Sequence, residues 1–249
     1  MATRRITLEG PCNFRDLGGY PTADGRLTRW GRLYRSDSMH TLTTADVPVL
    51  QELGVRTAID FRSNHELDQI GIGPLGEVSI THVHCPTFDM DPNGEAPPFV
   101  GGSAATFYAR MMESGAPAYV AAARAVADAD AMPAVFFCMA GKDRTGVFAA
   151  LVLGLLGVPD DVIVADYALT HEVIPTIAER REAREAALEM RIRWEDIPED
   201  LKGAHSHVME ELLGIVRERW GDWEGYAAAA GFPDETVATL RAQLVDAQL

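Results

Sequence analysis

The chain has 249 residues, of which 47% are hydrophobic, and a formal net charge of −15 at pH 7. A mean hydropathy of −0.05, with no apolar run of about 20 residues, excludes a predicted membrane-spanning helix. The negative charge argues against nucleic acid or an anionic membrane as an obligate partner. This length suits a single domain over residues 1–249, in which 160–249 form a mostly helical C-terminal part packed on the rest.

The number and spacing of the cysteines indicate the cellular compartment in which the protein is expected. There are three of them, Cys12, Cys85 and Cys138, and they form no C-x-x-C pair. A sparse, odd set favours reduced thiols and a cytoplasmic protein. No apolar segment follows the arginines near the start, so a secretory signal peptide is not predicted, and secretion by another route is left open.

The first half of the chain alternates between predicted strands and helices. Residues 12–26 are rich in turn formers, and Asp24-Gly25 predicts a short hairpin. Residues 43–54 combine a threonine helix start, apolar residues at helical spacing and a glycine stop. Residues 56–62 are typical of a parallel strand that runs into a polar loop, and 78–86 alternate like another strand.

A long loop and a set of helices complete the predicted elements. Residues 91–102 are rich in Pro and Gly and suggest a flap. Helices are predicted over 104–112, 118–129, 147–156, 160–167, 177–192, 207–220, 222–226 and 233–244. Strands that alternate with helices up to Leu156, followed by helices only, predict an α/β protein with a central, mostly parallel sheet, flanking helices and extra C-terminal helices.

The stretch from 134 to 156 carries the chemistry. It begins as the apolar strand Ala-Val-Phe-Phe, buried on both faces, breaks at Gly141, and resumes as an apolar helix. Cys138 is therefore expected at the carboxyl end of a strand, with Arg144 six positions later where a helix begins.

Such a loop can wrap around a tetrahedral anion. The helix start supplies about half a positive charge, and Arg144 can bind two oxygens at once. The same field favours the nucleophilic thiolate of Cys138. The expected phosphate-binding residues are Met139, Ala140, Gly141, Lys142, Asp143 and Arg144. A structural thiol beside a solvated turn is the disfavoured alternative, because a Lys-Asp-Arg turn directly after a buried strand needs a purpose for its charges.

The pattern Cys138-x5-Arg144, followed by Thr145, resembles the signature loop of cysteine-dependent protein tyrosine phosphatases. The string Cys-Met-Ala-Gly-Lys-Asp-Arg-Thr-Gly over 138–146 resembles the bacterial branch that includes mycobacterial tyrosine phosphatase B. Further segments of the same branch pattern are Asn-Phe-Arg-Asp-Leu-Gly-Gly at 13–19, Arg-Ser-Asp-Ser at 35–38 and Ile-Asp-Phe-Arg at 59–62. The resemblance implies the tyrosine/dual-specificity phosphatase fold, a phosphocysteine intermediate on Cys138, and neither metal nor cofactor.

The resemblance also implies substrates and supporting roles. Phosphotyrosine in proteins is the first expected substrate, and phosphoserine, phosphothreonine and phosphoinositides are further ones. Lys142 would add a second cation over the phosphate, as in phosphoinositide phosphatases; a plain surface lysine is the alternative. Thr145 would donate a hydrogen bond to the thiolate and help it leave, in addition to any role at the helix start.

The leaving group needs a proton, and three aspartates compete to supply it. Asp143 lies within the loop, Asp60 ends an earlier strand, and Asp89 lies on the loop after the strand that precedes the cysteine strand. Asp143 and Asp60 rank about equal, ahead of Asp89. Each also has a structural alternative: Asp143 could fix Arg144, and the other two could shape their loops.

One position departs from the family pattern. Phe137 stands where the family usually has a histidine that helps to hold the thiolate ready. Two other functions therefore stay open: a phosphate-binding module without turnover, and, less favoured, a rhodanese-type sulfurtransferase with its own strand-end cysteine loop.

Overall fold

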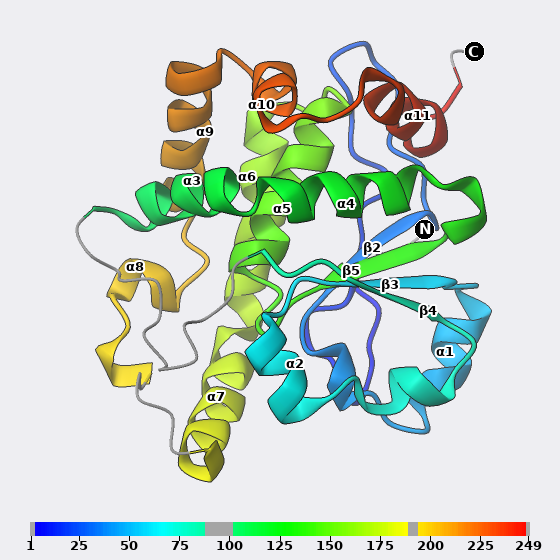
Figure 1. The fold of residues 1–249 in the computed structure, drawn as a ribbon, viewed down its shortest axis with the longest axis vertical. Coiled ribbons are helices and arrows are strands. Elements are labelled where there is room, and N and C mark those ends of the chain that lie inside the picture. The colour runs from blue at the N-terminus through cyan, green and yellow to red at the C-terminus, as the bar shows by residue number, and fades with distance from the viewer. Residues whose placement is uncertain (1–2, 88–101, 189–193, 248–249) are drawn as a thin grey trace.

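The computed structural model describes residues 3–87, 102–188 and 194–247, and its centre is a sheet with the strand order β1-β2-β5-β3-β4 (Figure 1). The strands are β1 (Arg15–Asp16), β2 (Leu33–Ser36), β3 (Thr57–Asp60), β4 (Thr81–His84) and β5 (Ala134–Phe137). β1 pairs with β2 in the antiparallel sense, and every other pairing is parallel. The predicted α/β class with a mostly parallel sheet is confirmed.

The register brings the ends of the strands together. Phe137 of β5 lies opposite Ser36 of β2 on one side and Asp60 of β3 on the other. The chain leaves all these strands at the same edge, because their carboxyl ends coincide in a parallel sheet. Cys138 therefore emerges in the middle of this edge, between the segments that follow β2 and β3.

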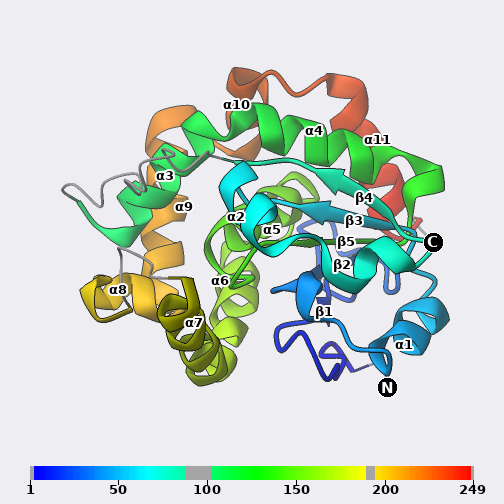
Figure 2. The same cartoon turned by 60° about the horizontal axis from the view of Figure 1, so that its bottom comes forward.

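Helices cover both faces of the sheet and extend beyond it. They are α1 (Asp46–Glu52), α2 (Asn64–Ile70), α3 (Ala104–Ser114), α4 (Ala116–Ala127), α5 (Asp143–Leu155), α6 (Asp160–Ala168), α7 (Ile174–Leu188), α8 (Glu199–Lys202), α9 (Ser206–Trp220), α10 (Trp223–Ala230) and α11 (Asp234–Leu244). Figure 2 shows α3 and α4 over one face, with α10 and α11 beyond them, and α1 on the opposite side. Among the described residues, no helix is both long and apolar enough to cross a membrane.

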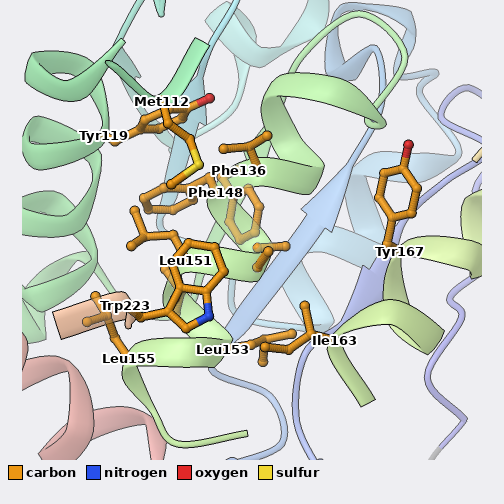
Figure 3. Packing of buried hydrophobic residues seen from close by; sticks show 14 of the residues in the cluster. Met112, Tyr119, Phe136, Phe148, Leu151, Leu153, Leu155, Ile163, Tyr167 and Trp223 are labelled. Atoms are coloured by element: carbon orange, nitrogen blue, oxygen red, sulfur yellow. The ribbon is translucent and has the colours of Figure 1, made fainter. Parts of the chain in front are cut away.

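Alternate residues of the central strand belong to two apolar clusters. Phe136 packs in the larger one, where its ring meets Phe148 of α5 edge-on at 4.9 Å between centroids (Figure 3). Phe137 faces the smaller cluster, together with Leu50 of α1. Burial on both faces explains why the strand is uninterruptedly apolar. The larger cluster also includes residues of α9, α10 and α11, which favours the expectation of a single domain; that expectation stays a prediction.

The N-terminal half holds the main differences from the sequence-based elements. The predicted hairpin is confirmed by an antiparallel bridge between Pro21 and Leu27. The strands β1 and β2 were not predicted, because β1 spans only two residues and the polar Arg35 and Ser36 interrupt the apolar pattern of β2. The polar loop expected after β3 is the start of α2, where Ser63 and Glu66 form a reciprocal capping box. Asp89 and most of the expected 91–102 flap lie outside the described residues.

Candidate active site

Cys138 opens the loop that joins β5 to α5, and it is almost fully buried. The carbonyl groups that follow it are held from outside the loop. The Cys138 carbonyl accepts a hydrogen bond from the Ser38 amide at 2.9 Å, and the Met139 carbonyl accepts one from the Ser38 hydroxyl. The Arg-Ser-Asp-Ser segment after β2 therefore fixes the first turn of the loop.

Gly141 is held in the same way and requires its lack of a side chain. Its carbonyl accepts hydrogen bonds from Asn13 Nδ2 at 3.1 Å and from Arg35 Nη2 at 2.9 Å. Its φ is +61°, and a Cβ atom would lie 2.5 Å from the Ser36 carbonyl oxygen. A left-handed backbone in close contact with β2 is a position that only glycine fills without strain.

The backbone N–H groups of the loop differ from its carbonyl groups. Within the described ranges, no group accepts a hydrogen bond from the backbone N–H groups of residues 139 to 143. These amides lie directly before and at the start of α5, where the helix dipole adds positive potential. The loop thus has the donors and the local field of an oxyanion cradle, although the protein as a whole is acidic.

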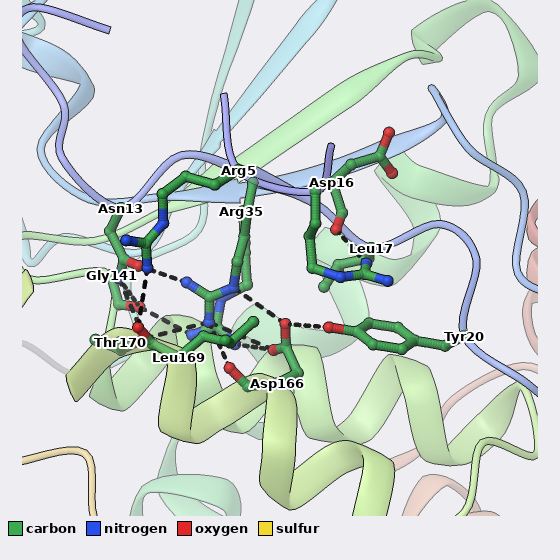
Figure 4. Close-up of polar contacts among 12 residues, drawn as sticks. Arg5, Asn13, Asp16, Leu17, Tyr20, Arg35, Gly141, Asp166, Leu169 and Thr170 are labelled. Carbon is green, nitrogen blue, oxygen red and sulfur yellow. Dashed lines mark hydrogen bonds and ion pairs between the residues drawn. The ribbon is translucent and has the colours of Figure 1, made fainter. Parts of the chain in front are cut away.

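A buried polar network supports the cradle from below. Arg15 Nε donates to Asp166 Oδ1 at 3.0 Å, Arg35 Nη1 donates to the other oxygen, and the Tyr20 hydroxyl donates to Oδ1 at 2.8 Å (Figure 4). All four side chains are buried. Burial by itself raises the pKa of Asp166, but the two guanidinium groups outweigh it and hold that pKa well below its usual range. The N-terminal motif is therefore a structural support that reaches Gly141 through Arg35 and Asn13.

Arg144 is oriented by a carboxylate that the sequence interpretation missed. Its Nη2 donates to Glu66 Oε1 at 3.0 Å, and its Nη1 donates to Oε2 of the same residue. Glu66 Oε2 also accepts from the Ser63 amide at 2.8 Å, so one carboxylate caps α2 and orients the arginine. Burial raises the pKa of Glu66, and the charge of Arg144 more than reverses this. The pair is ionised, and the guanidinium is fixed at the edge of the loop.

Asp143 is the first residue of α5, and its side chain is 29% exposed. Its Oδ1 accepts a hydrogen bond from the Tyr108 hydroxyl at 2.6 Å and lies 3.3 Å from Lys142 Nζ. A carboxyl group with this exposure, fixed through one oxygen, can exchange protons with a substrate or water.

Lys142 is turned toward the C-terminal part of the chain. Its ammonium donates to the carbonyl oxygen of Leu201 and to that of Gly203 at 3.4 Å. Only 3% of the residue is exposed. The loop lysine therefore ties the end of α8 to the cradle in this structure, and its expected role over a bound phosphate stays a prediction.

Asp60 has a different environment from Asp143. Asp60 is fully buried. Its Oδ2 accepts a hydrogen bond from Arg62 Nη2 at 2.6 Å and lies 3.1 Å from His82 Nε2. Burial raises its pKa, but the hydrogen bonds from His82 and Arg62 prevail and bring that pKa to about 2. Both carboxylate oxygens of Asp60 therefore take part in an ion pair with Arg62 beneath the loop. This favours a structural role for Asp60, as an ionised group, over a role as proton donor.

The sequence analysis also drew attention to Thr145 and Phe137, in the same segment as Cys138. The Thr145 hydroxyl is fully buried and has no hydrogen-bond partner among the described residues, so it could donate to a thiolate. Phe137 is packed among apolar side chains on the other face of the sheet, with the Arg62 guanidinium 5.6 Å from its ring centre. The position before Cys138 thus serves the core of this protein.

The family model described as the tyrosine phosphatase family matches residues 6–246. The chain belongs to the tyrosine phosphatase family. The predictions of a bacterial-type tyrosine phosphatase and of an enzyme of this class are thereby confirmed. The chain is 29% identical to the triple specificity protein phosphatase PtpB of Mycobacterium tuberculosis, in an alignment that covers 98% of this chain and all of that protein. It is 35% identical to a putative tyrosine-protein phosphatase of Cupriavidus necator over 62% of this chain and 59% of that one.

Two solved structures are more distantly similar. TpbA from P. aeruginosa, crystallised as a cysteine-to-serine variant in complex with phosphotyrosine, matches 84% of this chain and 91% of its own at 14% identity, with a TM-score of 0.35. The core catalytic domain of the PP-IP phosphatase SIW14 from S. cerevisiae matches 76% of this chain and all of its own at 15% identity, with a TM-score of 0.38. The fold assignment rests on the sheet order and connections of this chain itself.

Proposed function

We propose that this member of the tyrosine phosphatase family hydrolyses phosphomonoesters through the thiolate of Cys138. The sulfur attacks phosphorus in line, the bond to the leaving oxygen breaks, and a phosphocysteine forms. Water then attacks phosphorus, the P–S bond breaks, and inorganic phosphate and the thiolate are released. The observation that carries the proposal is the run of loop amides after Cys138 that have no acceptor among the described residues, bordered by the oriented Arg144. These donors would stabilise the equatorial oxygens in both steps.

Asp143 is the proposed general acid. It would protonate the leaving oxygen in the first step and take a proton from water in the second, which returns it to its starting state. Its partial exposure and its place at the start of α5 support this role. Asp60 is the weaker candidate because it is buried and paired with Arg62. The hydroxyl of Thr145 would donate to the sulfur as it leaves phosphorus.

The proposed first substrate class is phosphotyrosine in proteins, with phosphoserine, phosphothreonine and phosphoinositides as further substrates. The relative from M. tuberculosis carries a name that specifies three specificities, which motivates a broad panel for this chain. We also propose a cytoplasmic setting, since a thiolate nucleophile needs reducing conditions. Lys142→Ala tested on phosphopeptides and phosphoinositides decides whether the loop lysine leaves its carbonyl partners to bind substrate. Unchanged ratios between the two substrate classes would remove that role.

The decisive experiment compares wild type with Cys138→Ser on p-nitrophenyl phosphate. Wild type is expected to turn over, and the variant to be inactive while it keeps the wild-type melting temperature. Hydrolysis by Cys138→Ser at the wild-type rate would refute the thiolate mechanism. Phosphate binding by wild type without turnover would instead identify a phosphate-binding module.

A further inference from the structure

Three helices bring hydrogen-bonding groups together behind Asp143. Tyr108 of α3 donates its hydroxyl hydrogen to Asp143 Oδ1 at 2.6 Å. The hydroxyl of Tyr167, on α6, lies 2.8 Å from that of Tyr108. Tyr108 is fully buried, and Tyr167 is 1% exposed. Two buried hydroxyls therefore lead from the core to the carboxyl group at the start of α5.

The direction of these hydrogen bonds follows from counting hydrogens. A tyrosine hydroxyl has one hydrogen, and that of Tyr108 goes to the carboxylate. Tyr167 must then donate to Tyr108. Burial first, and the charge of Asp143 second, raise the pKa of Tyr108 well above its usual value, so that it stays a donor at every working pH. The contact is a charge-assisted hydrogen bond of short length.

Packing keeps the second tyrosine in place. A Cβ atom added to Gly146 would lie 3.0 Å from Cδ2 of the Tyr167 ring, so the ring contacts the signature helix where that helix has no side chain. The rings of Tyr108 and Tyr167 meet at 75° with centroids 6.2 Å apart. Neither hydroxyl is therefore able to turn away without repacking the interface of three helices.

We propose that Tyr108, supported by Tyr167, is a positioning residue that selects which oxygen of Asp143 handles the catalytic proton. Oδ1 accepts from Tyr108 and faces Lys142, so it stays the unprotonated oxygen when Asp143 is in its acid form. Oδ2 then carries the proton, which passes to the leaving oxygen as the bond to phosphorus breaks. This rests on the proposed function of Asp143 and adds a residue from α3 that no motif of the signature loop contains.

A matched control is present in the same core. Tyr119 of α4 is also fully buried, and its hydroxyl has no hydrogen-bond partner among the described residues. Tyr119→Phe therefore removes a buried hydroxyl without removing a contact to Asp143. Tyr119→Phe therefore reports the effect of changing a core tyrosine to phenylalanine when no hydrogen bond is lost.

The test uses substrates that differ in their need for a proton. The phenolate of 2,4-dinitrophenyl phosphate leaves without protonation, whereas that of phenyl phosphate needs an acid. Because hydrolysis of the phosphocysteine is common to both esters, the comparison uses kcat/KM, which reports its formation. Tyr108→Phe is expected to lower kcat/KM for phenyl phosphate about tenfold and to leave kcat/KM for the dinitrophenyl ester within about twofold, as loss of part of a general-acid contribution requires. Tyr167→Phe is expected to act in the same direction by about threefold, and Tyr119→Phe to change neither rate.

The outcomes separate this inference from the proposed function. An equal fall on both esters in Tyr108→Phe, or no fall on either, would overturn the positioning role. Asp143→Asn gives the full size of the general-acid effect, with an expected loss of about a hundredfold in kcat/KM on phenyl phosphate and little loss in kcat/KM on the dinitrophenyl ester. If that variant kept full activity while Cys138→Ser was inactive, the acid assignment and this inference would both fail, and the nucleophile would stand. An active Cys138→Ser variant would refute the proposed mechanism itself.

Discussion

Glu66 offers a sharp test of how the site is built, because one carboxylate caps α2 and orients Arg144. Gln can replace Glu in a capping box, so Glu66→Gln keeps the helix start while it removes the charge that faces the guanidinium. The pair lies in a mostly buried setting, with 10% of the Arg144 side chain and 23% of the Glu66 side chain exposed. The contact is therefore little screened by water.

The magnitude follows from the two hydrogen bonds that join the pair. Hydrogen bonds to charged groups contribute about 1.5 to 3 kcal/mol each, and a neutral amide can keep one of the two in weaker form. A loss of about 2 kcal/mol in the positioning of Arg144 corresponds to about a 30-fold fall in kcat/KM. The fall should appear with p-nitrophenyl phosphate and with phosphopeptides alike, because every substrate presents the same phosphoryl oxygens.

Ser63→Ala is the matched control. It removes the other half of the capping box and is expected to lower the free energy of unfolding by about 1 kcal/mol, with the Glu66–Arg144 pair intact. The assay measures kcat/KM and urea unfolding for both variants. The reasoning is refuted if Glu66→Gln stays within about threefold of wild type, or if Ser63→Ala loses as much activity as Glu66→Gln.

Three further predictions concern the support of the loop. Asp166→Asn should lower the free energy of unfolding, measured by urea unfolding, by about 3 kcal/mol, because two buried guanidinium groups lose their counter-ion. A loss below about 1 kcal/mol would contradict this reasoning. Gly141→Ala should lower kcat/KM on p-nitrophenyl phosphate by about a hundredfold, since the new Cβ would lie 2.5 Å from the Ser36 carbonyl oxygen and displace the loop amides. A variant with the wild-type rate would show that the loop accommodates the added Cβ without losing the position of its amides. The pKa of Asp60 is about 2 in the folded protein against an ordinary 3.8, so its contribution is present above about pH 4 and lost as pH falls through about 2. Urea unfolding should show wild type losing about 2 kcal/mol more than Asp60→Asn across that window, and parallel curves would argue against the ion pair.

The N-terminal motif shows where local pattern is insufficient. Its turns follow from glycines and an Asp-Gly pair, and the hairpin at Pro21 and Leu27 forms as expected. The strand β1 spans only two residues and half of β2 is polar, so neither shows the apolar pattern of a buried strand. Their burial comes from partners far along the chain, among them Asp166 and the loop carbonyls.

Glu66 was missed although a signal for its position existed. Ser63-x-x-Glu66 is a capping-box pattern and could have predicted the start of α2. No local rule could have paired that carboxylate with Arg144, which is 78 residues away in sequence. The same holds for Tyr108 and Asp143, because their contact depends on how α3 crosses the start of α5.

The sequence alone determined the parts of the loop that are contiguous. An apolar strand, a break at Gly141 and a helix start within one stretch predict Cys138 at the end of a strand and Arg144 at the start of a helix, because backbone geometry there is local. The tertiary structure decided what surrounds it: Asp60 becomes a buried ion-pair partner, Asp143 accepts a hydrogen bond from Tyr108, and Lys142 points to α8. Those differences arise from burial and long-range partners, which set the charge and orientation of a side chain more strongly than its neighbours in sequence do.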